Sequence, residues 1–438
     1  MNISPKTSLK KILLIMMETV FGFLIFSNTE PEILIELFIL QYIVIVYVSK
    51  FDFESPLCWY LGVFTLYTIG YPLLYVTGNN MTQGFSPEPI QWCWIAVFVF
   101  VCVFSPEQNK KLNEKMDCDY NFGNMNIMKY FIIVSLIIVF VDVYLIYSSG
   151  YRNKGEIYGK ADFYITFVFT LIYSIQTIYI YLMHINLILN KKSENMNLMI
   201  IIGAESLLLT LFSGERDIFI RYLILTVFFL FINKEINRFK MFLSCMMIVV
   251  FFMISRFIKY YFLTAESNLY SFVPSLFSWK GLIGIIFGGE FESASKNLQI
   301  LANDSVAASG VFFGSSYISD VVRILGITLN SSMTWFNDRY YFGSAVGHGF
   351  TIVGEGFVNF GILGIVLSFV IIGSIINWMY KKRGKNPAYA SIYIISIPIF
   401  MYAIRADLAN IFSPMVRQIL LPLLLANLFL RKENRSHT

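Results

Sequence analysis

Apolar runs long enough to cross a bilayer recur along this whole chain. Each is about 17–25 residues long, the length of helix needed to cross roughly 30 Å of hydrocarbon. They differ from the short segments of alternating polarity, about 10 residues each, that build an outer-membrane barrel. With 57% hydrophobic and only 14% charged residues, the chain cannot bury its apolar surface in one aqueous core. The sequence therefore predicts an all-α, polytopic integral membrane protein.

Twelve of these runs have the length and composition of transmembrane helices. We expect them to form a single transmembrane domain over residues 1–438. The predicted spans are 12–27, 31–48, 57–77, 89–104, 129–148, 161–189, 198–213, 217–232, 241–263, 350–379, 388–404 and 415–430.

The basic residues orient these spans, because Lys and Arg gather in the cytoplasmic loops of membrane proteins. With twelve spans and a cytoplasmic N-terminus, every short internal loop carries at least one of them, including Lys191, Lys192 and the cluster at 381–385. Adding or removing one helix would place one of these groups outside. We therefore predict that both termini are cytoplasmic. We interpret the clusters as topology anchors and expect no nucleic-acid partner.

One external connection, residues 264–349 between the ninth and tenth spans, is far longer than any other. Loops of this length with little charge are uncommon unless they act as lids or binding elements. Within it, residues 273–287 and 306–328 are apolar and interrupted by glycine. We expect them to lie along the membrane interface or to dip into it. Such a loop is suited to covering a lipid-linked substrate.

Arginine dominates the basic residues predicted on the external side, whereas lysine dominates inside. The positive-inside rule does not explain external arginines, but the guanidinium group binds phosphate in bidentate fashion. Arg216 lies beside a predicted helix N-terminus, where anions bind, although it can instead pair with Glu215 or Asp217. The alternative for the others is a snorkelling or solvated charge. The candidate phosphate-binding residues are Arg216, Arg221, Arg256, Arg323, Arg339 and Arg405.

A glycine-rich segment, residues 343–364, runs directly into the tenth span. It holds His348 and Glu355, seven residues apart at a predicted membrane surface, where either side chain can take a proton from a hydroxyl group. We therefore predict both as catalytic residues, one of them the base. The alternatives are a histidine satisfied by backbone at the helix entry and a glutamate in a structural salt bridge.

No pattern in the sequence indicates a metal or nucleotide site. HExxH, a DxD motif at a membrane surface, a Walker loop and a GxGxxG motif that opens a βαβ unit are absent, and the five cysteines show no CxxC spacing. We expect neither a metal nor a cofactor. The driving force must then come from the substrate or from an ion gradient.

Acids within the predicted spans keep a second class of protein open, because a proton- or sodium-coupled transporter would also need them. The long external loop argues against a lipid-linked oligosaccharide flippase or another transporter. The lack of a repeat between residues 1–215 and 216–438 argues against it as well. A membrane acyltransferase with His348 as the base is a third class. The acids are Glu18, Glu36, Asp142 and Glu205.

Twelve spans, one long external loop, the turn Ser213-Gly-Glu-Arg-Asp and the helix entry Gly-Glu-Gly-Phe-Val-Asn-Phe-Gly-Ile-Leu-Gly at 354–364 together resemble the bacterial O-antigen polymerase (Wzy) family. The resemblance covers the whole topology, with sequence similarity concentrated in the two motifs. O-antigen ligases share the helix entry. They more typically carry a His-Asn pair before it, whereas this chain has His348-Gly349. That difference favours a polymerase and leaves a ligase as an alternative.

The resemblance implies a GT-C-like membrane glycosyltransferase of the bacterial inner membrane that makes O-antigen or capsule-type polysaccharide. Such an enzyme transfers a growing glycan from one undecaprenyl diphosphate to the non-reducing end of a second carrier-linked repeat unit, at the periplasmic face. The implied partners are the undecaprenyl-diphosphate-linked oligosaccharide, the lipid bilayer and a chain-length regulator protein. The leaving lipid diphosphate develops negative charge that fixed cations can stabilise. The external arginines are candidates for this role, and His348 or Glu355 for the base.

Overall fold

The computed structural model describes most of the chain and, within the described ranges, every regular element is a helix. Each of the twelve predicted spans overlaps one or more of these helices. The all-α prediction is therefore confirmed for the described part of the chain. The described residues are 5–104, 122–148, 154–188, 196–213, 216–263, 278–305, 309–327, 329, 331–342 and 349–430.

Four helical segments are long and apolar enough to cross a membrane within the described ranges: Pro31–Val48, Pro56–Val76, Ile362–Lys382 and Ala409–Leu430. Shorter apolar helical segments cover Glu88–Val103, Ile127–Val141, Leu198–Thr210 and Pro387–Ala403. These helices fit a membrane protein. The count of twelve crossings and the cytoplasmic location of both termini stay predictions.

The chain groups into two compact units, so the prediction of one domain over residues 1–438 stays a prediction. Unit 1 comprises Met1–Asn109, Asn268–Lys381 and Ile399–Ser413, and unit 2 comprises Lys110–Ser267, Lys382–Pro398 and Pro414–Thr438. Unit 1 contains α1 (Pro5–Phe26), α2 (Pro31–Val48), α3 (Pro56–Val76), α4 (Glu88–Val103), α11 (Trp279–Phe287), α12 (Glu290–Asn303), α14 (Ser315–Val322), the 3₁₀ turn η2 (Arg323–Leu325), α15 (Ser332–Tyr340), α16 (Ile352–Phe360), most of α17 (Ile362–Lys382) and most of α19 (Ala409–Pro414). Unit 2 contains α5 (Phe122–Ser148), α6 (Lys154–Ile188), α7 (Met196–Ser213), α8 (Arg216–Ile232), α9 (Arg238–Leu263), the π-helical turn η3 (Met415–Leu420) and α20 (Leu421–Leu430); α18 (Pro387–Ala403) contributes to both units.

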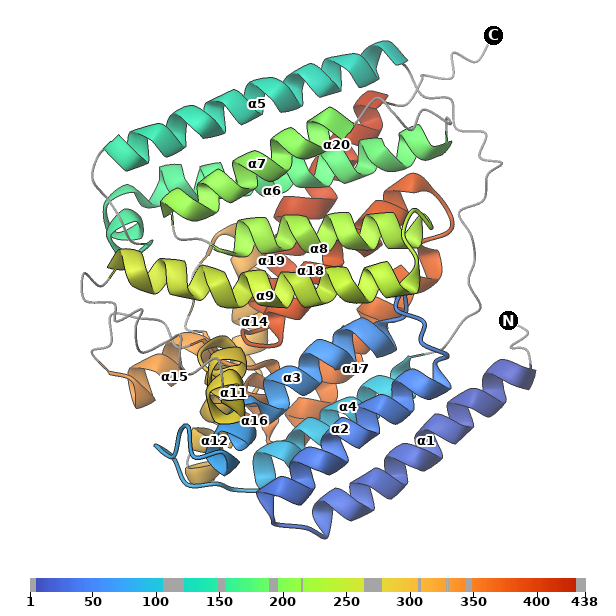
Figure 1. The fold of residues 1–438 in the computed structure, drawn as a ribbon, viewed down its shortest axis with the longest axis vertical. Helices are drawn as coiled ribbons and strands as arrows, with labels where there is room; N and C mark the ends of the chain where they lie inside the picture. The colour runs from blue at the N-terminus through green and yellow to red at the C-terminus, as the bar shows by residue number, and fades with distance from the viewer. Residues whose placement is uncertain are drawn as a thin grey trace. The chain divides into compact units, whose positions relative to one another are not determined.

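Helices α1–α4 of unit 1 pack side by side (Figure 1). Helix α12 lies closely against α3 because Gly70 places no side chain between them: a Cβ atom there would lie 2.5 Å from the carbonyl oxygen of Phe291. The Tyr71 N–H also donates to Ser295 Oγ at 2.7 Å. This part of the predicted long loop is therefore fixed on a helix that is long enough to span the membrane.

The predicted helix at 350–379 is wrong in one respect, because the structure divides it at Gly361 into α16 and α17. Gly361 has φ +59°, a left-handed conformation that L side chains rarely adopt. Beyond this break the two helices approach so closely that a Cβ on Gly364 would lie 1.8 Å from the Gly356 carbonyl oxygen. The glycines of this motif therefore set the geometry with which the chain enters α17.

The predicted external connection is largely helical where the structure describes it, with α11, α12, α14, η2 and α15. Helix α14 has an inverted polarity: Ser316 and Asp320 are buried at 0% exposure, whereas Ile318 and Val321 are 63% and 52% exposed. A helix surrounded by water shows the opposite pattern. This inversion favours the prediction that residues 306–328 contact the membrane.

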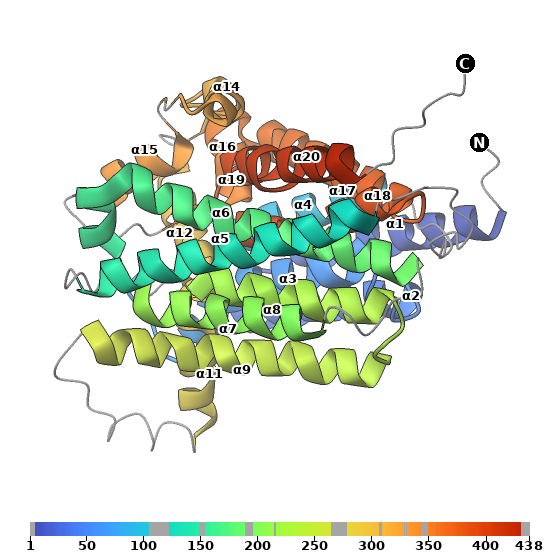
Figure 2. The same ribbon diagram turned by 90° about the horizontal axis from the view of Figure 1, so that it is seen from above.

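Helices α7, α8 and α9 of unit 2 follow one another as neighbours, α7 on α8 and α8 on α9 (Figure 2). Some polar side chains inside this unit are paired with one another. The amide of Gln176 on α6 donates to Ser206 Oγ at 3.1 Å, and Nδ1 of His184 lies 2.8 Å from Ser391 Oγ. These bonds satisfy polar groups that would be costly in an apolar interior.

Replacing Gly364 by Ala tests the close contact between α16 and α17. The added methyl group overlaps the Gly356 carbonyl, so α16 must shift, and we expect a loss of about 3 kcal/mol or more, the upper end for overpacking. Gly84→Ala is the matched control, since nothing lies within 4 Å of its Cβ position. Thermal unfolding in detergent, with size-exclusion chromatography as the readout, should show a lower melting temperature for Gly364→Ala than for Gly84→Ala. Equal melting temperatures would contradict the contact.

Candidate functional site

Glu355 is the centre of the candidate site and lies in the first turn of α16. The helix begins after Thr351, whose side-chain oxygen accepts a bond from the Gly354 N–H at 2.7 Å. The Glu355 side chain is 0% exposed. A buried carboxylate is costly unless it accepts hydrogen bonds. The Glu355 carboxylate accepts them from three separate segments of unit 1.

Three donors from distant parts of the chain reach the Glu355 carboxylate. Ser316 Oγ of α14 and Ser332 Oγ of α15 each donate to Oε1 at 3.0 Å, and the backbone N–H of Leu408 donates to Oε2 at 2.8 Å. Asn359, one turn further along α16, donates to Ser316 Oγ at 2.7 Å and so supports the first of these bonds. One side chain therefore joins α14, α15, α16 and the turn before α19.

Two further carboxyl groups, Asp320 and Asp407, interact electrostatically with Glu355. Both are 0% exposed. We call Glu355, Asp320 and Asp407 the acidic cluster. Asp407 Oδ1 accepts bonds from both the backbone and the side chain of Asn410, at 3.2 and 2.6 Å. Within the described part of the chain, no group of three or more His, Cys, Asp or Glu residues could hold a metal ion.

The acidic cluster shares a proton. Burial raises the pKa of Glu355, the Asp407 charge raises it further, and the hydrogen bond with Asp320 lowers it. For Asp320, burial, the Glu355 charge and the hydrogen bond to Glu355 all raise the pKa, whereas Arg323 lowers it. Adjacent buried carboxylates cannot both ionise at low cost. The proton therefore resides on Asp320, the carboxyl group whose pKa is raised more.

Two of the predicted arginines flank this cluster within unit 1. Arg323 follows α14 directly and interacts with Asp320. Arg405 precedes Asp407 by two residues, and its guanidinium carbon lies 4.8 Å from the ring centroid of Tyr402. The Arg405 carbonyl accepts the Phe350 N–H at 3.1 Å. The structure therefore brings Glu355, Arg323 and Arg405 into one neighbourhood.

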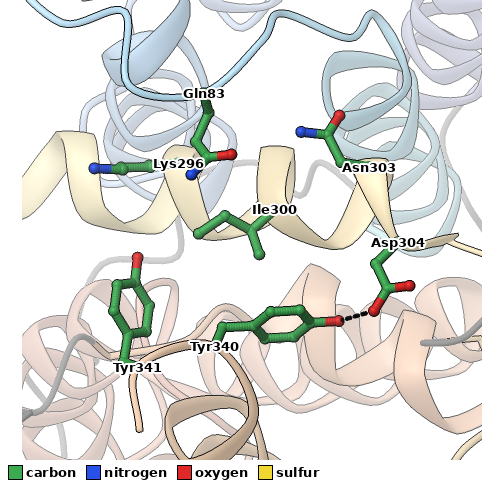
Figure 3. Close-up of a pocket in the computed structure, with 7 residues that line it drawn as sticks. All are labelled: Gln83, Lys296, Ile300, Asn303, Asp304, Tyr340 and Tyr341. Atoms are coloured by element: carbon green, nitrogen blue, oxygen red, sulfur yellow. Dashed lines mark hydrogen bonds between the residues drawn. The ribbon is translucent and has the colours of Figure 1, made fainter. Parts of the chain in front are cut away.

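Arg339, at the end of α15, has a different environment. Its Nη2 lies 2.8 Å from Oδ2 of Asp304, and its guanidinium lies over the rings of Trp335 and Tyr340. The pair is partly exposed, with side-chain exposures of 42% and 34%. Asp304 belongs to a pocket lined from α12, α15 and the segment before α4 (Figure 3). Arg339 is thus engaged by a carboxylate at this pocket.

Arg216 and Arg221 belong to unit 2, on the first turns of α8. Arg221 is 4% exposed, donates to Gln418 Oε1 and lies over the Tyr173 ring at 4.3 Å. Tyr173 in turn donates to Asp217 at 2.9 Å. Arg221 therefore faces protein groups of its own unit. Arg256 lies on α9, but its side chain is outside the described residues, as is the whole of His348.

The sequence does not predict four residues of this site: Asp320, Asp407, Ser316 and Ser332. Asp320 lies in an apolar stretch predicted to be interfacial, and an acid in such a stretch is a signal for a buried partner. Asp407 lies in the same Ile-Arg-Ala-Asp-Leu segment as Arg405, and a single acid in a predicted external loop does not by itself indicate a buried site. The two serines carry no local signal.

Residues 322–434 match the model of a protein family described as O-antigen polysaccharide polymerase Wzy. This stretch includes Arg323, Glu355, Arg405 and Asp407. It confirms, over these residues, the family resemblance expected from the sequence. No curated protein and no solved structure matches the chain.

Exchanging Asp320 for Asn tests the shared proton. The folded cluster keeps a proton that free carboxyl groups release near pH 4, so its contribution to stability is present at low pH and is lost as pH rises through the raised pKa values. An Asn side chain at position 320 is neutral at every pH and has no such proton to lose. The variant should therefore lose less stability between pH 5 and 8, by up to about 1.4 kcal/mol per pH unit, the effect of one proton.

The measurement is the melting temperature of the purified protein at several pH values. Asp338→Asn on α15 serves as the control, because Asp338 is exposed. If both variants follow the pH dependence of the unaltered protein, the shared proton does not exist.

Proposed function

We propose that this chain, which carries an O-antigen polysaccharide polymerase Wzy domain at residues 322–434, joins polyprenyl-diphosphate-linked oligosaccharide repeat units into a polysaccharide. The family match supports an O-antigen polymerase role in general, and the apolar helices support a membrane protein. The finer proposal is a glycosyltransferase of the bacterial inner membrane that works at the periplasmic face with undecaprenyl diphosphate as the carrier. Its structural basis is the buried Glu355, which holds two arginine-bearing segments around one site.

The proposed reaction exchanges one bond for another. The oxygen of an acceptor sugar hydroxyl attacks the anomeric carbon of the donor glycan, and the bond from that carbon to the diphosphate oxygen breaks. The bonding electrons leave with the lipid diphosphate, and the hydroxyl proton passes to a base. Cleavage of the bond between the anomeric carbon and the diphosphate drives the transfer, so a nucleotide is not needed.

For the base we propose His348, which directly precedes the described helix entry. Glu355 is the other candidate, but its carboxylate accepts three hydrogen bonds and has no exposed surface. A general base must reach the proton that it abstracts. We therefore assign Glu355 a positioning role: it fixes Leu408 and, through the same turn, Arg405.

For the leaving diphosphate we propose Arg323 and Arg405, because they flank the site in the segments that Glu355 joins. Fixed cations stabilise charge that develops in the transition state. Arg216, Arg221 and Arg256 stay proposed contacts for the carrier phosphates. Arg339 is already engaged by Asp304, so we no longer assign it to the diphosphate.

A polymerisation assay tests the proposal directly. Purified protein in proteoliposomes receives a synthetic polyprenyl-diphosphate repeat unit of the host's own polysaccharide, without nucleotide or ion gradient, and products are separated on a gel. We expect a ladder with regular spacing. Arg405→Ala should slow its formation about 10²–10³-fold, as loss of one charge-stabilising group does. Arg238→Ala removes the same charge at the exposed start of α9 and should leave the rate unchanged.

The ion-coupled flippase is the contrasting outcome. A protein that gives no product longer than one unit, yet moves the same lipid across the bilayer, would overturn the polymerase. The buried Glu18, which accepts a hydrogen bond from Gln41, would then be among the residues to replace.

His348→Ala tests the proposed base. Loss of a general base slows the chemical step about 10²–10⁴-fold, whereas substrate binding should change little, so kcat should fall much more than KM rises. His437→Ala in the C-terminal tail is the control. An unaltered kcat in His348→Ala would leave the residue without a role in proton transfer.

A further inference from the structure

A pocket of about 380 Å³ opens in unit 1 between α12 and α15. Ligand pockets in proteins usually measure about 300–1,000 Å³. The seven lining residues come from three separate segments, and Figure 3 shows the Tyr340 and Tyr341 side chains facing the α12 side of the pocket. The lining residues are Gln83, Lys296, Ile300, Asn303, Asp304, Tyr340 and Tyr341.

The walls of this pocket are fixed by hydrogen bonds. Asp304 accepts bonds from Arg339 Nε at 3.2 Å, from Arg339 Nη2 at 2.8 Å and from Tyr340 Oη at 2.7 Å. These bonds also hold the pKa of Asp304 below its usual value, the Tyr340 bond most strongly. All three use Oδ2, and Oδ1 accepts none from the described residues. Asp304 is therefore an ionised acceptor with one oxygen left for a ligand.

The remaining groups offer both donors and acceptors. The side-chain amides of Gln83 and Asn303 make no hydrogen bond to any described residue, and an amide carries two donors and one acceptor. Lys296 adds one positive charge and Asp304 one negative charge, so the lining is balanced. The Tyr340 and Tyr341 rings line the pocket, and the negative quadrupole of an aromatic face attracts polarised C–H groups. Aromatic faces with amides and one carboxylate suit a neutral ring that carries many hydroxyl groups.

We propose that this pocket is a binding subsite for a neutral pyranose ring of the acceptor oligosaccharide. The proposal rests on the proposed function and deepens it, because a polymerase must hold the acceptor sugar as well as the diphosphate. Arg339 then acts as a positioning residue for the glycan through Asp304.

A chain of contacts connects the pocket to the helix entry. Tyr341 Oη donates to Asn297 Oδ1 at 3.0 Å, and Asn297 Nδ2 lies 3.5 Å from the carbonyl oxygen of Gly349, the residue after His348. A sugar in the pocket is therefore connected through Tyr341 and Asn297 to Gly349, which follows the proposed base directly in the sequence. This connection fits the acceptor sugar better than the donor's carrier lipid.

Binding can be measured without catalysis, using the full-length protein in nanodiscs. The probe is the free oligosaccharide repeat unit released from the host polysaccharide by mild acid, and saturation-transfer NMR reports its contact with the protein. We expect Gln83→Ala and Asn303→Ala each to weaken binding about tenfold, the effect of one hydrogen bond to the ligand. Asp338→Asn, exposed on α15 and outside the pocket, should bind like the unaltered protein.

A competition experiment separates a sugar site from a phosphate site. Inorganic diphosphate should not displace the oligosaccharide, because the lining carries no net positive charge. Displacement by diphosphate, or equal binding by all variants, would overturn the proposal. Two independent pocket variants are used so that a folding defect in one does not decide the result.

The polymerisation assay distinguishes this proposal from the function on which it rests. Both pocket variants should raise the acceptor concentration needed for half-maximal ladder formation about tenfold, with the maximal rate unchanged. Sugar binding without any ladder would preserve the pocket and overturn the polymerase. A normal ladder with unchanged acceptor dependence in both variants would overturn the pocket and preserve the polymerase.

Discussion

The buried charge of Glu355 is the constraint on which the arrangement of the candidate site depends. Removing a carboxylate from water costs several kcal/mol unless donors replace its hydration. The donors come from Ser316, Ser332 and Leu408, which lie on three different segments. No one of these segments could satisfy the charge alone. The same requirement that stabilises Glu355 therefore fixes α14, α15 and the Arg405 turn around α16.

Glycine makes this convergence possible. The left-handed Gly361 and the contact between Gly356 and Gly364 let α16 turn back closely on α17. With larger residues at these positions, α16 would lie further from α17 and the carboxylate of Glu355 would move with it. In the sequence, the glycine motif at 354–364 resembles a simple helix entry. In the structure, its break at Gly361 sets the direction in which Glu355 meets its donors.

The sequence predicted the helices well and the candidate site only in part. Apolar runs mark helices because each run has its own length and composition. Most helix bounds agree with the predicted ones within three residues, whereas α1, α5 and α6 begin seven residues earlier than predicted. The break at Gly361 was missed because both sides of it are equally apolar. Asp320 joins Glu355 from 35 positions away, and the pocket takes Gln83, Asn303 and Tyr340 from three segments. Such contacts follow from tertiary packing, which cannot be predicted directly from a single sequence.

The position of an arginine in the sequence did not predict its environment either. Arg323 and Arg339 lie sixteen positions apart in the same connection, yet one interacts with a protonated acid and the other with an ionised one. Asp304 stays ionised beside Arg339 because Tyr340 and Arg339 donate to it, so an incoming phosphate would have to displace a carboxylate. Asp320 instead keeps a proton because burial and Glu355 oppose its charge. The acidic cluster thereby opposes less of the positive charge of Arg323 and Arg405 than three ionised carboxylates would. A proton held inside the cluster thus favours an anion beside those two arginines, which is the condition that a leaving diphosphate requires.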